Sequence, residues 1–162
     1  MPRLFAGALL FTLGCMSPGT PQDSATMEDD VGDIGELPPM GNVALTAWLA
    51  EGHYLAWACE AEAHPARPPG AHGANRICSN AALSASEAGT FPIGAASVKE
   101  LYSGGSLSGY AVGRKLTAGT ERASWYWYEK IGTSVVADSA GAGLCAGCHE
   151  DATRDHVFTQ VR

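Results

Sequence analysis

The five residues Cys145-Ala-Gly-Cys148-His149 constrain this chain more than any other feature of its sequence. Two thiols two residues apart, followed at once by an imidazole, are typical of covalent haem c attachment, in which the histidine binds the iron. A thioredoxin-like redox pair belongs in a βαβ unit, and a zinc site needs a second ligand pair at similar spacing. The sequence predicts neither context, so we expect one haem c bound through Cys145, Cys148 and His149.

Residues 1–15 have the proportions of a secretory signal, because Arg3 precedes an apolar run from Leu4 to Leu13 that is too short to span a bilayer. Cys15 could be the lipid-modified first residue of a bacterial lipoprotein, although Thr12 stands where leucine is usual. An ordinary cleaved signal with an incidental cysteine is the alternative. Haem c is attached outside the cytoplasmic membrane, so we expect an exported protein, either periplasmic or anchored to the outer membrane.

The formal net charge of −7 is concentrated near the N-terminus. Residues 16–42 contain six acidic residues and no Lys or Arg, and they are rich in Pro, Gly, Asp and Ser. This composition predicts an acidic flexible tether. Residues 43–162 contain eleven acidic and nine basic residues and form the predicted haem domain. They show no basic stripe, so nucleic acid is not an expected partner.

Two cysteines remain once Cys15 is assigned to the signal and two others to haem. Cys59 and Cys78 could form a disulfide in an oxidising compartment. Two buried free thiols are the alternative.

Hydrophobic periodicity predicts an α+β, mainly β fold: an antiparallel sheet with an N-terminal helix packed on it and a C-terminal haem-binding segment. Apolar residues recur at helical spacing over 43–62, weakened by Gly52. The sequence Ser103-Gly-Gly-Ser106 is typical of a hairpin. The other predicted elements are a short helix over 81–88, strands over 75–80, 95–103, 109–116 and 124–131, and loops over 64–73 and 137–143.

The predicted domain lacks a methionine beyond Met40 that could bind the iron opposite His149. The available histidines are His53, His64, His72 and His156. His64 and His72 fall in a Pro- and Gly-rich loop, and His156 follows His149 too closely to reach the other haem face without a tight reversal. We therefore expect an iron with one open position, which implies ligand binding or catalysis rather than electron transfer.

Five strings, in this order, resemble the cytochrome P-460 family, which is related to the β-sheet cytochromes c′. They are Phe91-Pro-Ile-Gly leading into Val98-Lys-Glu-Leu-Tyr102, Gly109-Tyr-Ala-Val112, Trp125-Tyr-Trp-Tyr-Glu129, Cys145-Ala-Gly-Cys-His149 and Asp155-His-Val-Phe-Thr159. The resemblance covers about residues 43–162. It implies a β-rich homodimer with a five-coordinate haem c and a lysine bonded covalently to the porphyrin.

The resemblance assigns that lysine to Lys99, in the Val-Lys-Glu-Leu string. Strand alternation places Lys99 on the face of Leu101, toward an apolar layer, where a desolvated amine becomes nucleophilic. An edge-strand lysine with its amine in solvent is the alternative. Arg76, on the preceding strand, would lie near the haem and pair with a propionate or an iron-bound ligand, although a surface position fits it nearly as well. Glu100 and Glu129 alternate with aromatics and could orient neighbouring strands or relay protons, and no distal proton-transfer carboxylate is assigned.

Three functions follow from these features. The first is oxidation of hydroxylamine to nitrous oxide or nitric oxide, with electrons passing to an unidentified acceptor. The second is non-catalytic binding of nitric oxide or another gas, which needs an open iron but no Lys99 bond. The third is electron transfer, which needs a second protein ligand on the iron. The sequence favours the first.

Overall fold

The computed structural model describes residues 37–162; the predicted signal (1–15), Cys15 and most of the predicted tether (16–42) lie outside the described residues. Six strands form one antiparallel sheet whose spatial order follows the chain order. The strands are β1 (Ala58–Cys59), β2 (Ala74–Ser79), β3 (Ala96–Ser103), β4 (Ser106–Lys115), β5 (Trp125–Ile131) and β6 (Ser134–Ala140). The helices are α1 (Asn42–Glu51), α2 (Ala81–Ser84) and α3 (Gly143–His149), with 3₁₀ turns at His53–Ala56 and Arg122–Ser124. The prediction of a mainly β protein with some helix is confirmed.

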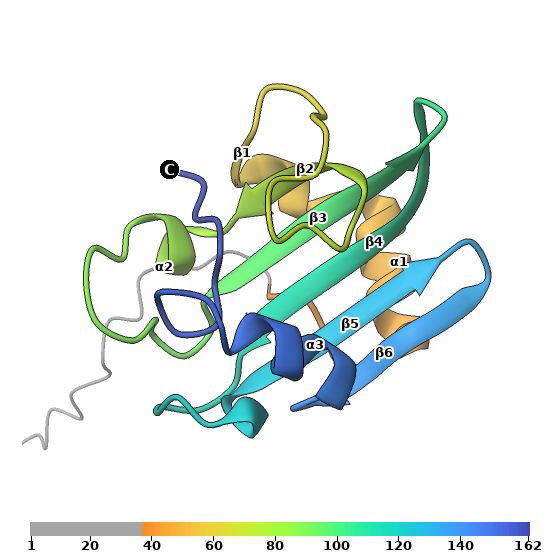
Figure 1. Cartoon of the computed structure of the whole chain (residues 1–162). Coiled ribbons are helices and arrows are strands. Elements are labelled where there is room, and N and C mark those ends of the chain that lie inside the picture. The colour runs from red at the N-terminus through yellow and green to blue at the C-terminus, as the bar shows by residue number, and fades with distance from the viewer. Residues whose placement is uncertain (1–36) are drawn as a thin grey trace, which may run out of the picture. The chain divides into compact units, whose positions relative to one another are not determined.

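Helix α1 covers one face of the sheet, and α3 with the C-terminal segment covers the other (Figure 1). Figure 1 shows α1 behind the strands, and α3 with the chain's C-terminal segment in front of them. The layer under α1 is apolar and is made of Leu45, Trp48, Leu49, Tyr54, Cys78, Val98, Val112, Tyr126 and Tyr128. A second buried cluster contains Leu83, Phe91, Ala95, Trp125, Trp127 and Ala146, and Cys145 and Val157 pack against it. Each face of the central strands therefore has its own core.

The β3–β4 hairpin forms where the sequence predicted it. Ser103 pairs with Ser106, and the two intervening glycines have positive φ, 58° at Gly104 and 82° at Gly105. Positive φ at both central positions is the geometry of a type I′ two-residue hairpin turn. The predicted helix over 81–88 is shorter, Ala81–Ser84, and begins where the Asn80 side chain accepts a hydrogen bond from Leu83 N–H.

The predicted helix over 43–62 is wrong in its second half. Gly52 adopts a left-handed conformation with φ 73° and its N–H donates to the carbonyl of Leu49, so the helix ends at Glu51. Glycine is favoured at this position because it has no Cβ to clash. The chain then turns and enters β1, where Cys59 lies opposite Cys78 and is joined to it by a disulfide. The predicted disulfide is thus present.

The predicted loop over 137–143 is also wrong, because β6 continues to Ala140. Its small side chains lie opposite the large ones of β5: Ser139 pairs with Trp127, and Ala137 with Glu129. Small residues lower the intrinsic strand signal, but here they fit beside bulky neighbours across the sheet. Pairing with β5 therefore decides the conformation of this segment.

Residues 37–42, at the end of the predicted tether, contact the sheet. The guanidinium of Arg114 donates to the carbonyl of Pro38 at 2.8 Å. Gly41 N–H donates to the Tyr126 hydroxyl at 2.9 Å, and Asn42 N–H donates to the carboxylate of Asp138 at 2.8 Å. The approach to α1 is thereby fixed to the ends of β4, β5 and β6. Within the described residues, none of the helices has the length and apolar character needed to cross a bilayer.

Candidate functional site

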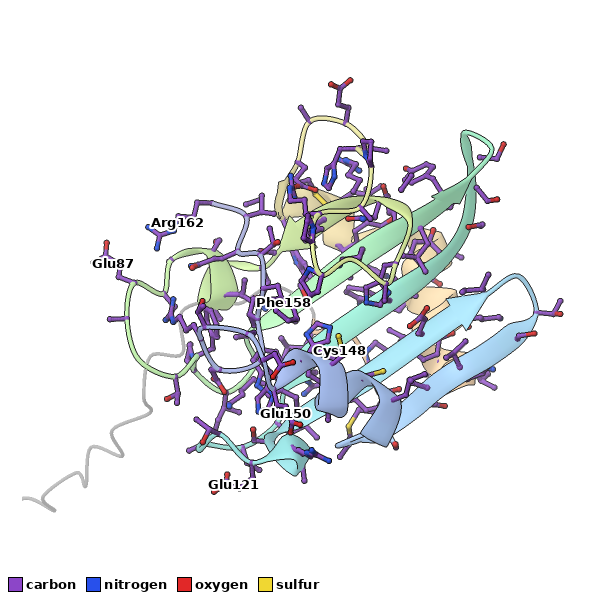
Figure 2. All side chains as sticks on the ribbon, in the orientation of Figure 1. Glu87, Glu121, Cys148, Glu150, Phe158 and Arg162 are labelled. Atoms are coloured by element: carbon purple, nitrogen blue, oxygen red, sulfur yellow. A yellow bond between two sulfur atoms is a disulfide. The ribbon has the colours of Figure 1, made fainter. Side chains whose placement is uncertain are left out.

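Helix α3 brings the three residues of the Cys-x-x-Cys-His motif to one side. Cys145, Cys148 and His149 stand at positions i, i+3 and i+4, which share a helix face. Cys145 packs against the second core cluster, whereas Cys148 is exposed, and neither thiol is in a disulfide. In Figure 2, Cys148 and Phe158 lie in front of the sheet, on the side opposite α1. The motif is therefore presented as two free thiols and an imidazole facing a common space.

The His149 ring is held by its Nδ1 atom. Nδ1 lies 2.7 Å from the backbone oxygen of His156, and because a carbonyl only accepts, Nδ1 carries the proton and donates. The rings of Trp127 and Phe158 flank it, with centroids 4.4 Å and 5.3 Å away. Burial lowers the pKa of His149 to about 4, so the ring is neutral at neutral pH. Its Nε2 lone pair is left for a metal, the usual arrangement of a histidine ligand.

Lys99 and Glu129 face this space from the sheet. They share a register row in which Ile77, Lys99, Ala111, Glu129 and Ala137 follow one another across β2 to β6. Burial lowers the pKa of Lys99, against the opposing attraction of the carboxylates of Glu60 and Glu129. A lowered pKa increases the share of neutral, nucleophilic amine. Lys99 was predicted to point toward an apolar layer; it shares the face of Ile77 and Trp127 as alternation predicts, but this layer also contains His72 and Glu129.

The loop between β1 and β2 adds a second imidazole. His72 Nδ1 lies 3.6 Å from a carboxylate oxygen of Glu129, close enough for ion pairing but beyond hydrogen-bond reach. The imidazole of His72 makes the largest contribution to lowering the pKa of Glu129, because its contact stabilises the ionised carboxylate. The centroids of the His72 and His149 rings are 6.3 Å apart. The loop therefore places His72 on the same side of the sheet as the motif, although its Pro- and Gly-rich sequence favoured a solvated role.

Three hollows on this face share Lys99 and His149 in their walls. The first is covered by the loop residues 67–72 and also borders Cys148 and Phe158. The second extends over Trp125, Trp127 and Val157, and the third borders His72, Glu129 and Cys145. Gly113 makes room here, because a Cβ at that position would lie 3.2 Å from the Trp127 ring. Cys145, Cys148 and His149 each border at least one hollow that Lys99 also borders.

The donor set fits a covalent haem c. Two free thiols and an unprotonated Nε2 converge from α3, and the buried Trp127 Nε1 and His72 Nδ1 on the same face have no hydrogen-bond partner. In residues 37–162 no three His, Cys, Asp or Glu side chains gather in the arrangement that a metal ion held by protein ligands alone requires. All strand pairs in this range are antiparallel, so the motif does not sit in the βαβ unit of a thioredoxin-like pair.

Arg76 is the predicted site residue that the structure does not bring to this face. Arg76 pairs directly with Glu100 across β2 and β3, so both side chains point to the α1 side. The Arg76 guanidinium lies 3.3 Å from the Glu100 carboxylate, which also accepts from the hydroxyls of Tyr54 and Tyr102. The reason is the two-residue period of strands, which sends Arg76 and Lys99 to opposite faces. The buried network around Glu100 fixes β2 to β3 and to the turn after α1.

Glu129 and His72 border the site but were not assigned to it from the sequence, whereas Trp127 is one of the four aromatics of residues 125–128, some of which were expected to line the haem pocket. Alternation along β5 puts Trp125, Trp127 and Glu129 on one face, and this signal could have placed Glu129 beside Lys99 once the β3–β4–β5 register was known. His72 carries no comparable signal, because it lies in a loop. His156 contributes a backbone oxygen to His149 rather than a ring nitrogen to iron.

Comparison with protein-family models, with curated proteins and with solved structures found no match for this chain. The family resemblance therefore stays a prediction that rests on the five sequence strings.

Proposed function

We propose that this chain is an exported mono-haem c-type cytochrome with an open iron position, which oxidises hydroxylamine to nitrous oxide or nitric oxide. The observation that carries the proposal is the placement of Lys99: its side chain borders the same three hollows as His149, and the free thiols Cys145 and Cys148 border two of them between them. A lysine bonded to the porphyrin is the distinguishing feature of the cytochrome P-460 family. When bound, the haem would supply a redox-active iron.

Each residue of the site would have a distinct role in binding the haem or in the reaction. Cys145 and Cys148 would hold the group by thioether bonds, and His149 would bind the iron through Nε2. Lys99, whose buried amine borders the same space, would be the side chain that is bonded to the ring, as the family resemblance implies. Oxidation of hydroxylamine releases protons and electrons in equal number. Glu129, kept ionised beside His72, can accept a proton, while the electrons pass to an unidentified acceptor.

The test is steady-state turnover of hydroxylamine with an artificial oxidant, combined with peptide mapping. Wild-type protein should turn over, and a proteolytic haem fragment should contain the Lys99 peptide joined to the Cys145–His149 peptide. Lys99→Ala should abolish turnover while the haem stays attached through the two cysteines. Lys130→Ala is the matched control, because Lys130 borders a different hollow, beside α1, and should leave turnover unchanged.

Coloured wild-type protein without turnover and without the Lys99 fragment would contradict the enzymatic proposal. It would support the non-catalytic binding of nitric oxide or another gas.

His72 favours electron transfer as the second candidate function. Histidine ligands usually donate their other ring nitrogen to a carboxylate or carbonyl, and His72 Nδ1 faces the Glu129 carboxylate, although at 3.6 Å the two do not form a hydrogen bond. The His72 and His149 rings lie on the same face of the sheet with their centroids 6.3 Å apart, so His72 would be the second histidine available to hold the iron. A low-spin, six-coordinate spectrum in both oxidation states would support this function over hydroxylamine oxidation.

A further inference from the structure

The backbone that receives the His149 hydrogen bond has an uncommon conformation. Asp155 and His156 have φ of 39° and 64°, the left-handed region that residues other than glycine rarely adopt. Two such residues in succession persist only where the surrounding structure holds them. This turn directs the His156 carbonyl at His149 Nδ1, 2.7 Å away.

A buried ion pair holds the turn. The ammonium of Lys115 lies 2.7 Å from Asp155 Oδ1, and the two side chains are 0% and 1% exposed. Asp155 Oδ1 also accepts from Trp125 Nε1 at 3.2 Å, and Oδ2 accepts from the N–H of Phe91 at 2.7 Å. The Lys115 ammonium donates further to Ser124 Oγ at 3.1 Å and to the carbonyl of Gly119. The turn is thereby tied to the end of β4, the start of β5 and the loop before β3.

The side chain of His156 closes the turn from the other side. Its Nε2 donates to the carbonyl of Thr120 at 2.8 Å, so the ring is directed away from His149. Both residues of the turn are therefore anchored by their side chains, and the backbone oxygen of His156 is left for His149.

The contribution of the Lys115–Asp155 ion pair to folding stability does not by itself explain why it is buried here. Taking two charges out of water offsets most of their attraction, and an apolar pair of similar volume usually stabilises a fold as well or better. What the pair does determine is the position of one carbonyl. Because the partner of Nδ1 sets the tautomer, orientation and basicity of a ligating imidazole, this carbonyl controls what His149 offers through Nε2.

We infer that the Lys115–Asp155 ion pair is a positioning device for His149, acting through the left-handed turn at Asp155 and His156. The inference rests on the proposed function, in which His149 binds the haem iron. Lys115 and Asp155 touch neither substrate nor iron in this account. They fix the hydrogen bond that sets the direction and the electron donation of the proximal imidazole.

The experiment compares two double variants of the full exported chain. Lys115→Met with Asp155→Leu replaces the pair by apolar side chains. Arg122→Gln with Glu150→Gln is the matched control, because this ion pair is exposed, Nε to Oε2 at 2.8 Å, and Glu150 directly follows His149. The readouts are covalent haem content, the iron–imidazole vibration of the ferrous protein by resonance Raman, and the reduction potential.

The Lys115/Asp155 variant should retain covalent haem. Its iron–imidazole vibration should move to lower frequency and broaden, and its reduction potential should rise, because a weaker Nδ1 hydrogen bond makes the imidazole a poorer donor. The Arg122/Glu150 control should match wild type in both readouts.

An unchanged vibration and potential in the folded Lys115/Asp155 variant would overturn the inference and leave the proposed function intact. If that variant does not fold, Asp155→Asn decides: it keeps the side-chain volume and an oxygen acceptor, and it should shift both readouts in the same direction, whereas no shift overturns the inference. A wild type that carries haem but shows no iron–imidazole vibration, or one without haem, would overturn the proposed function and this inference together.

Discussion

Lys99 of β3 and Glu129 of β5 lie in one register row with only Ala111 of β4 between them. The small side chain of alanine leaves the space above it to its long neighbours, one cationic and one anionic. Each residue bears on the other's pKa: the carboxylate of Glu129 opposes the lowering of the Lys99 pKa by burial, and Lys99 contributes to the lowered pKa of Glu129. The row thus places an amine and a carboxylate on the same face of the sheet as Cys145, Cys148 and His149.

The first prediction concerns the pH dependence of Glu129. Its pKa in the folded protein lies below the ordinary 4.5, chiefly because of His72, so between those two values the unfolded state binds more protons. Its contribution to stability is therefore present above pH 4.5 and is lost as the pH falls through the folded pKa. Glu129→Gln should lower the free energy of unfolding by about 1 kcal/mol at pH 7.

The contribution of Glu129 to stability is measured by urea unfolding of wild type and Glu129→Gln at several pH values, from pH 7 down to the pH at which wild type unfolds without urea. The difference should shrink steadily below pH 4.5. Glu87→Gln is the control: Glu87 is exposed in the loop after α2, and Figure 2 shows it pointing away from the sheet. A difference between wild type and Glu129→Gln that stays constant with pH would contradict the assigned pairing with His72.

The second prediction concerns His72. If the iron has an open position, ferric wild type and His72→Ala should both be high-spin by absorption and electron paramagnetic resonance, because His149 is the sole protein ligand. His64→Ala is the matched control, since His64 lies in the same loop with Nε2 2.9 Å from Glu60. A low-spin wild type that becomes high-spin only in His72→Ala would reassign the protein to electron transfer.

Much of the sheet could be predicted from local patterns, and the reasons for the two failures are physical. The Gly104-Gly105 hairpin and β3 follow from turn chemistry and alternation, which act within a few residues. β6 was missed because Ala137 and Ser139 carry little strand propensity, and what places them in a strand is the partner strand β5. The half-length of α1 depends on Gly52 taking a left-handed C-terminal position, where the sequence indicated only a weakened helix.

Some residues of the site could likewise be predicted from local sequence patterns, and others could not. Cys145, Cys148 and His149 are close in the sequence and were assigned together, but the sequence did not predict α3, and only with α3 known does the helix period place them on one face. The face of Lys99 follows from alternation, whereas the expectation that Arg76 lies near the haem came from the family resemblance, and the register with Glu100 places Arg76 on the other face. His72 and the His156 carbonyl come from loops, whose paths depend on contacts distant in the sequence.

The third prediction concerns the packing of Trp127 on Gly113. A methyl group at position 113 would lie 3.2 Å from the indole ring, so the ring must move. Gly113→Ala should lower the free energy of unfolding by about 1–3 kcal/mol, as overpacking does. It should also shift Trp fluorescence, since Trp127 lines the site beside His149. Gly143→Ala, which meets nothing within 4 Å, should do neither; equal effects from both variants would contradict the packing argument.

The fourth prediction concerns the disulfide. Cys59 and Cys78 are 19 residues apart and join β1 to β2 at the base of the loop that carries His72. Cys59→Ala with Cys78→Ala should lower the free energy of unfolding by about 3 kcal/mol, measured by urea unfolding. Reductant should destabilise wild type but leave the double variant unaffected. Wild type that is equally stable with and without reductant would contradict a structural role for the bridge.

The most direct measurement is covalent haem content after expression of the full chain with a working cytochrome c maturation system. We predict that exported wild-type protein keeps its haem through acid and organic extraction, that Cys145→Ala with Cys148→Ala loses it, and that Cys59→Ala with Cys78→Ala keeps it. Folded wild-type protein without bound haem under these conditions would contradict the account.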